Sequence, residues 1–89
     1  MKIREGFILK EIAGSYVVVP VGQDLVDFSS MITLNETGAF FWKLAEKGCT
    51  REEMINVCLD TYNVDQAILE RDIDKFIQTL TDNSLFEQV

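Results

Sequence analysis

The 89 residues suit one compact domain over residues 1–89, and a hydrophobic fraction of 47% with 26% charged residues is typical of a folded globular chain. The net charge of −7 disfavours nucleic acid and anionic membranes as partners, because both attract cationic protein surfaces. The chain has no histidine, the commonest general base and metal ligand, so neither catalysis nor a metal or cofactor site is expected.

The first third of the chain predicts a β-hairpin. Residues 7–13 and 16–21 are rich in β-branched and aromatic side chains, and Gly14-Ser15 between them suits a type II′ turn that would place Ile12 opposite Val17. One face would then carry Ile8, Lys10, Ile12, Val17, Val19 and Val21, and the other Leu9, Glu11, Ala13, Tyr16, Val18 and Pro20. We expect the first face to pack on the core, although the second is also unusually apolar. Pro20 cannot donate to a neighbouring strand, so it is expected at a strand end or on an edge.

Two short apolar stretches follow the hairpin, at residues 25–28 and 31–34, with Ser29-Ser30 between them. They fit either a second tight hairpin or one bent strand, and the pattern does not choose between these. The sheet is therefore predicted to have three to four antiparallel strands.

The remaining chain predicts three helices. Asn35 is a suitable N-cap for a first helix whose body, residues 39–45, is apolar nearly all round, and Gly48 ends it. The capping-box pattern from Thr50 to Glu53 opens a second helix that ends near Thr61.

A third helix is predicted from Asp65 to about Asp82. Its apolar residues recur at helical spacing and form one stripe: Leu69, Ile73, Phe76, Ile77 and Leu80. The tail Leu85-Phe86 either returns as a short strand or packs on the core. The predicted fold class is α+β, a small antiparallel sheet followed by three helices, with the parts of a winged helix-turn-helix.

Such a fold raises the alternative of a DNA-binding transcription regulator. The helix that would read DNA, residues 65–82, has five carboxylates and only two cations, Arg71 and Lys75. A helix with this charge is repelled by phosphates, so DNA binding is disfavoured.

No group of side chains matches a catalytic arrangement. Neighbouring carboxylates, such as Asp72 with Asp74, point in different directions on a helix and do not converge on one atom. Cys49 and Cys58 match no zinc or redox spacing, and a largely helical segment between them would keep them beyond disulfide reach. We expect two reduced thiols, with Cys58 in the core. The chain has no long apolar run and no signal peptide at its start, so a cytoplasmic location is predicted.

The segment Leu34-Asn35-Glu36-Thr37-Gly38-Ala39-Phe40-Phe41-Trp42 resembles the L-N-E-T-G-A-x-x-W signature of the D protein of pyrroloquinoline quinone biosynthesis (PqqD) and its relatives. Further similarities are Val18-Val19-Pro20, Tyr62-Asn63-Val64-Asp65 and the segment from Asp72 to Ile77 followed by Leu80. One departure is Asn83-Ser84, which stands where the family usually has a glycine before the closing apolar pair.

The resemblance implies a non-catalytic peptide chaperone. Members of this family bind the leader of a ribosomally made precursor peptide as an added strand, in a cleft between the sheet edge and the third helix, and present it to a radical SAM enzyme. By the same resemblance, one wall of the cleft would be formed by Leu25, Val26, Phe28, Met31 and Thr33, and the other by Arg71, Lys75, Phe76 and Thr79. The two cations would meet acidic leader residues. An exposed sheet edge also permits a homodimer.

Overall fold

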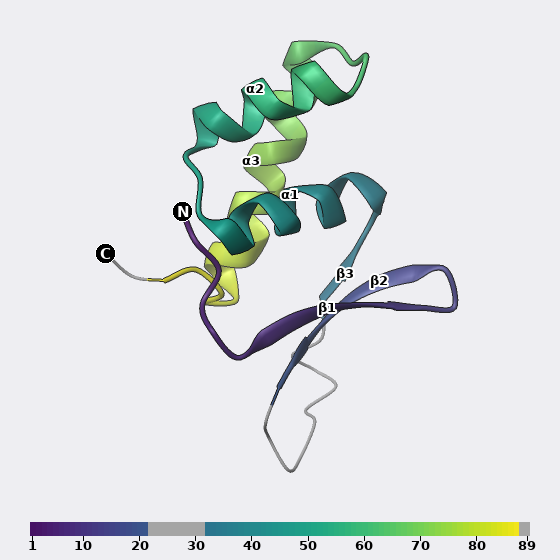
Figure 1. Ribbon diagram of the computed structural model, residues 1–89, viewed down its shortest axis with the longest axis vertical. Helices are drawn as coiled ribbons and strands as arrows, with labels where there is room; N and C mark the ends of the chain where they lie inside the picture. The colour runs from purple at the N-terminus through teal and green to yellow at the C-terminus, as the bar shows by residue number, and fades with distance from the viewer. Residues whose placement is uncertain (22–31, 88–89) are drawn as a thin grey trace.

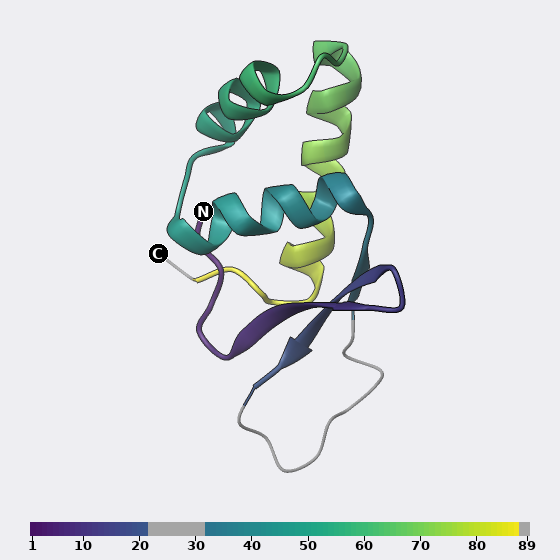
Figure 2. The same cartoon turned by 45° about the vertical axis from the view of Figure 1, so that its right-hand side comes forward.

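The computed structural model describes residues 1–21 and 32–87. The elements in chain order are β1 (Phe7–Ile12), β2 (Ser15–Pro20), β3 (Ile32–Leu34), α1 (Glu36–Lys47), α2 (Arg51–Thr61) and α3 (Gln66–Asp82). The strands form one antiparallel sheet in the order β1-β2-β3, and the helices gather on one side of it (Figures 1 and 2). The α+β fold expected from the sequence is confirmed. Residues 25, 26, 28 and 31 and the open question of their strand structure lie outside the described residues.

The β1–β2 hairpin turns one position earlier than predicted. Ile12 pairs with Ser15, so Ala13 and Gly14 form the turn, and their φ angles are 51° and 82°. Two central residues with positive φ are the requirement of a type I′ turn, whose twist matches that of the flanking strands. The expected Gly14-Ser15 turn, with Ile12 opposite Val17, is therefore wrong. Pro20 ends β2, as its missing N–H requires.

The face of the hairpin that packs on the core is also the opposite of the one expected. Val18 is only 1% exposed, and Phe7 and Leu9 pack beside it, whereas Ile8 and Ile12 are 40% and 49% exposed. Both faces are apolar, so local alternation could not decide which one the helices cover. The buried face is the one that presents the aromatic ring of Phe7 and the fully enclosed Val18.

Helix α1 has the predicted ends. The Asn35 Oδ1 accepts a hydrogen bond from the Gly38 N–H at 2.8 Å, and Gly48 is the C-cap. Phe41 and Trp42 are 1% and 0% exposed and lie in the core, whereas Phe40 is half-buried.

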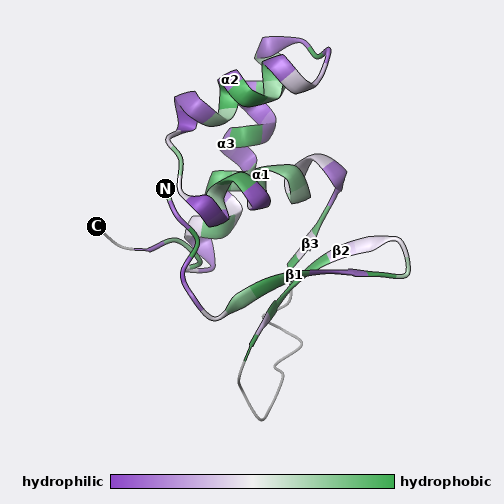
Figure 3. Ribbon diagram, viewed as in Figure 1, coloured by the Kyte–Doolittle hydropathy of each residue, from purple (hydrophilic) through white to green (hydrophobic). Residues whose placement is uncertain are grey.

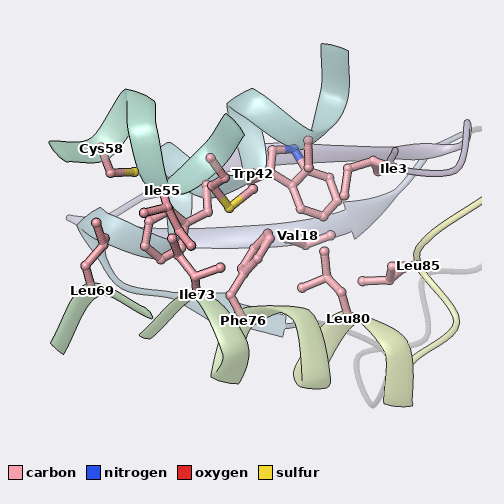
Figure 4. Packing of buried hydrophobic residues seen from close by; sticks show 13 residues of the cluster. Ile3, Val18, Trp42, Ile55, Cys58, Leu69, Ile73, Phe76, Leu80 and Leu85 are labelled. Carbon is pink, nitrogen blue, oxygen red and sulfur yellow. The ribbon is translucent and has the colours of Figure 1, made fainter. Parts of the chain in front are cut away.

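Helix α3 is amphipathic and α2 buries a short stripe of its residues, and hydrophilic and hydrophobic segments alternate along both ribbons in Figure 3. Both halves of the capping box between Thr50 and Glu53 are present, and the Asp65 side chain caps α3. The apolar stripe of α3 meets α1 and α2 in the single core drawn in Figure 4. Its buried members are Leu69, Ile73, Phe76 and Leu80, with Met54, Ile55 and Cys58 supplied by α2.

The two ends of the described chain lie together. Ile3 forms an isolated antiparallel bridge with Phe86, and the Arg4 N–H donates to the Leu85 carbonyl at 2.8 Å. Leu85 is 3% exposed. The tail therefore both packs on the core and pairs as extended chain, which settles the alternatives left open by the sequence.

Candidate functional site

A groove of about 330 Å³ lies between β3, the start of α1 and the second half of α3. In Figure 2, β3 descends from the start of α1 beside the lower half of α3. The groove is lined by Thr33, Leu34, Asn35, Thr37, Gly38, Phe41, Asp72, Lys75, Phe76 and Thr79. The groove lies where an edge of the described sheet meets a helix, because β3 is the last strand in the order β1-β2-β3.

The floor of the groove is aromatic. The rings of Phe41 and Phe76 meet edge to face, with centroids 5.6 Å apart and an interplanar angle of 65°. Both side chains are almost wholly buried, at 1% and 5% exposure. A floor held in this way by the core is rigid and apolar, and it favours an apolar group of a ligand.

The near wall of the groove is built by the direct passage from β3 into α1. Leu34 ends the strand, Asn35 caps the helix, and Gly38 lies in the first helical turn. A Cβ on Gly38 would lie 3.1 Å from the Asn35 Oδ1 and 3.3 Å from the Leu34 Cβ. Glycine thus allows the strand end and the cap to pack closely against the helix.

The far wall carries the charge of the groove. Asp72 and Lys75, both on exposed positions of α3, lie one helical turn apart, and Thr79 follows one turn later. The Thr79 hydroxyl donates to the Lys75 carbonyl at 2.9 Å, so it is engaged within its own helix. The groove therefore offers one cation and one carboxylate above an apolar floor.

Four of the nine residues predicted for the cleft line this groove: Thr33, Lys75, Phe76 and Thr79. Arg71 is exposed on α3, one turn before Lys75, and does not line it. Leu25, Val26, Phe28 and Met31 lie outside the described residues. The role of all nine in binding stays a prediction.

Six lining residues were not predicted: Leu34, Asn35, Thr37, Gly38, Phe41 and Asp72. Five of them belong to the segment 34–42, in which the sequence indicates a helix cap and resembles a family signature. Asp72 shares a helix face with Lys75 and Thr79, at offsets of three and seven residues, and this spacing was available in the sequence.

The two cysteines are free thiols. Burial raises the pKa of Cys58 and also that of Cys49, so neither is a reactive thiolate at neutral pH. Asp74 is engaged by Arg51, with nitrogen to oxygen distances of 2.7 and 3.0 Å. Both thiols therefore pack in or against the core, and Asp74 takes part in an ion pair.

Residues 1–21 and 32–87 hold no cluster of three or more potential metal ligands. In the same part of the chain, no helix combines the length and apolarity needed to cross a membrane.

Two comparisons relate this geometry to known proteins. The family model described as coenzyme PQQ synthesis protein D (PqqD) matches residues 16–85, a segment that contains every residue lining the groove. The solved structure "TbiB1 in Complex with the TbiA(beta) Leader Peptide" is similar, with a TM-score of 0.72 and 26% sequence identity, covering 100% of this chain and 98% of that chain. No curated protein sequence matches this chain.

Proposed function

The chain belongs to the coenzyme PQQ synthesis protein D (PqqD) family, and on that premise we propose that it is a non-catalytic protein that binds the leader of a ribosomally made precursor peptide. The observation that carries the proposal is the groove beside β3, an edge strand of the described sheet. The leader lies as an added strand along β3, and α3 forms the other side of its binding site. Main-chain hydrogen bonds to an edge strand give affinity, and a neighbouring groove gives selectivity for side chains.

The similar structure of TbiB1 contains a leader peptide, which supports this use of the fold. In this chain, an apolar leader side chain rests on Phe41 and Phe76. Lys75 receives an acidic leader residue, and Arg71, one turn away, extends the same cationic side. Asp72 disfavours an acidic group at its own end of the groove, which helps to fix the direction of the peptide.

In this role the protein delivers the precursor peptide to a partner and does not itself catalyse a reaction. A leader held in the groove keeps the rest of the precursor close to the active site of a partner, which we propose to be a radical SAM enzyme in the cytoplasm. Tethering raises the effective concentration of the substrate at that site without any new contact to the reacting atoms. No cofactor or metal enters this role.

The alternative of a winged-helix DNA-binding regulator is disfavoured by charge. Helix α3 and its cap hold five carboxylates against two cations, and the groove beside α3 contains Asp72. Contacts with DNA phosphates would require more cations than carboxylates on this helix. We expect no retarded migration of genomic DNA fragments at moderate salt; a salt-dependent shift would favour the regulator.

The direct test uses synthetic, fluorescein-labelled leader peptides taken from any short reading frames that flank the gene, with affinity measured by fluorescence anisotropy. Lys75→Glu is expected to raise the Kd about tenfold, the cost of replacing one charge-assisted contact with a repulsive one. Lys43→Glu, an equal charge change at an exposed position of α1 outside the groove lining, is the matched control and is expected to leave the Kd unchanged. Equal affinities for the two variants, or no saturable binding, would contradict the proposal.

The homodimer through a sheet edge remains a separate proposal, because a free edge strand can pair with that of a second copy. We expect a dimer mass at tens of micromolar protein in analytical ultracentrifugation. A monomer mass over that range would exclude it.

A further inference from the structure

The aromatic floor of the groove is in contact with a further ring outside it. Phe76 meets Phe41 within the groove, and it also meets Phe86 of the C-terminal tail edge to face, with centroids 6.4 Å apart and an interplanar angle of 74°. Among the described residues, Phe41 and Phe76 line the groove and Phe86 does not. The Phe76 ring is therefore supported from outside the groove by the ring of Phe86.

The contact between Phe76 and Phe86 stands between the groove and a second cavity. This cavity has a volume of about 740 Å³ and is lined by Arg4, Glu5, Thr81, Ser84, Phe86 and Glu87. In the described part of the chain, Phe86 lines this cavity and Phe76 lines the groove. A smaller side chain in place of Phe86 would give the Phe76 ring room to move away from the groove.

The backbone on both sides of Phe86 is fixed by hydrogen bonds to the start of the chain. The Arg4 N–H donates to the Leu85 carbonyl at 2.8 Å, and the Glu87 N–H donates to the Lys2 carbonyl, also at 2.8 Å. The Phe86 side chain is half-buried against the core. A ring held at its backbone and on one face forms a firm support for the groove floor.

We propose that Phe86 sets the size of the apolar leader residue that the groove accepts, by fixing how far Phe76 projects into the groove. The inference rests on the proposed function for the identity of the ligand. Phe86 is a positioning residue, because it acts through Phe76 and does not touch the leader. Apolar sites select by size, since a gap loses packing contacts and an excess group causes strain. Truncation of Phe86 deepens the site, and a larger leader residue is then favoured over a smaller one.

The test uses synthetic, fluorescein-labelled leader peptides taken from any short reading frames that flank the gene. In the peptide that binds the wild type, an alanine scan identifies the apolar position at which alanine raises the Kd most. Two peptides then carry leucine or phenylalanine at that position, and fluorescence anisotropy gives the ratio of the leucine-peptide Kd to the phenylalanine-peptide Kd. A partly unfolded variant weakens both peptides equally, so this ratio does not report a loss of folded protein.

Phe86→Ala is expected to raise this ratio about fivefold or more over the wild-type value, because a single methylene group in an apolar pocket changes discrimination about tenfold or more. Phe86→Leu removes less volume, so it is a milder change to the fold, and it is expected to raise the ratio about twofold.

The matched control is Phe40→Ala, which removes the same atoms elsewhere in the fold. Phe40 is also half-buried and also meets an aromatic ring edge to face, that of Tyr62, with centroids 5.2 Å apart. It is absent from the groove lining. The ratio for this variant is expected to equal that of the wild type.

An unchanged ratio in the Phe86 variants, a ratio shifted toward the smaller residue, or an equal shift in Phe40→Ala would overturn the inference. Each of these results requires leader binding by the wild type and so leaves the proposed function intact. Failure of the proposed function gives a different pattern: no peptide binds the wild type saturably, and the inference falls with it.

Discussion

Gly38 shows how one missing side chain shapes the groove. It lines the groove and is buried in the first turn of α1, where the Asn35 Oδ1 and the Leu34 Cβ would meet any added Cβ at 3.1 and 3.3 Å. Both neighbours belong to the near wall: Leu34 ends β3, and the Asn35 Oδ1 accepts the cap hydrogen bond from Gly38, so displacing either one disturbs this wall. The glycine of the family signature therefore has a steric reason in this fold.

We predict that Gly38→Val destabilises the protein by about 1–3 kcal/mol, the usual effect of overpacking, and weakens leader binding more than its folded fraction explains. Urea denaturation and anisotropy on the same samples measure the two effects. Gly48→Val serves as the comparison, because its new Cβ would meet only the flexible Lys2 side chain although φ is 87°. Leader affinity is expected to survive in that variant. A Gly38→Val protein of unchanged stability and affinity would refute the steric interpretation.

Ser84 occupies a conformation that glycine prefers. Its φ is 59°, and the adjoining N–H groups close the end of α3, with Ser84 donating to Thr81 at 3.1 Å and Leu85 to Leu80 at 2.9 Å. This is the position where the family usually has a glycine and where the chain has Asn83-Ser84. The helix end is kept by its hydrogen bonds, although a residue with a Cβ stands at the left-handed position.

Ser84→Gly is therefore predicted to stabilise the protein by about 1 kcal/mol, since the left-handed conformation costs an L-residue about this much. The midpoint of urea unfolding measures the gain. Ser15→Gly is the control, because Ser15 begins β2 without a positive φ, and glycine there should destabilise the strand. A lower urea midpoint for Ser84→Gly would show that the serine side chain stabilises the protein by more than its left-handed backbone conformation destabilises it.

At the scale of elements, α2 and α3 are joined by an ion pair on their exposed side. The Arg51 guanidinium binds both Asp74 oxygens, at 2.7 and 3.0 Å, and approaches the Glu70 carboxylate at 3.5 Å. The hydrogen bond from Arg51 lowers the pKa of Asp74 below its ordinary value of 3.8. Because the folded-state pKa is depressed, this stabilisation is present above the unfolded-state pKa and is lost as the pH falls through the folded-state value.

We predict that Asp74→Asn lowers the Tm slightly at pH 7, and that the difference from the wild type disappears in acid, where Asp74 is protonated in both states. Thermal unfolding followed by circular dichroism at both pH values provides the measurement. Asp72→Asn removes a carboxylate from the same helix outside this ion pair and controls for net charge. A Tm difference that persists unchanged at the acidic pH would contradict the assignment.

The turn between β1 and β2 contains a residue with a strained backbone conformation. Ala13 has a φ of 51° next to Gly14 in a type I′ turn, where asparagine followed by glycine is the favoured pair. Ala13→Asn is predicted to stabilise the protein by about 1 kcal/mol, through relief of the left-handed strain. The urea midpoint tests this, and Ala13→Val, which cannot relieve the strain, should shift it the other way. Equal midpoints for both variants would argue against this turn.

The helices were predictable because their signals are local. Each helix begins at a capping residue that can be recognised in the sequence: Asn35, Thr50 or Asp65. The spacing of the apolar residues from Leu69 to Leu80 predicts the buried stripe of α3. The hairpin sequence did not indicate which face packs on the core, because both faces are apolar. Contacts with the helices, which are distant in sequence, determine which face is buried. Its turn was misplaced because Ala13 gives no hint of a positive φ. The groove joins residues of three elements, so only Thr33, Lys75, Phe76 and Thr79 were found.

On the scale of the whole molecule, net charge is divided unevenly between two regions. Residues 1–34 have a net charge of −1 and residues 35–89 one of −6. Large apolar residues are exposed in both regions: Ile8, Ile12 and Val21 in the first, and Val57, Tyr62, Val64 and Ile68 in the second. The groove lies at their junction, with Thr33 and Leu34 from one side and Lys75 and Phe76 from the other.

The central claim is that a leader peptide occupies the groove between β3 and α3. Trp42 is fully buried and absent from the groove lining, so its fluorescence is a weak reporter. Amide resonances of ¹⁵N-labelled protein, titrated with the unlabelled synthetic leader, report every position directly. Saturable shifts concentrated in residues 32–38 and 72–79 are predicted. The absence of saturable shifts, or shifts that avoid both of these segments, would contradict the claim.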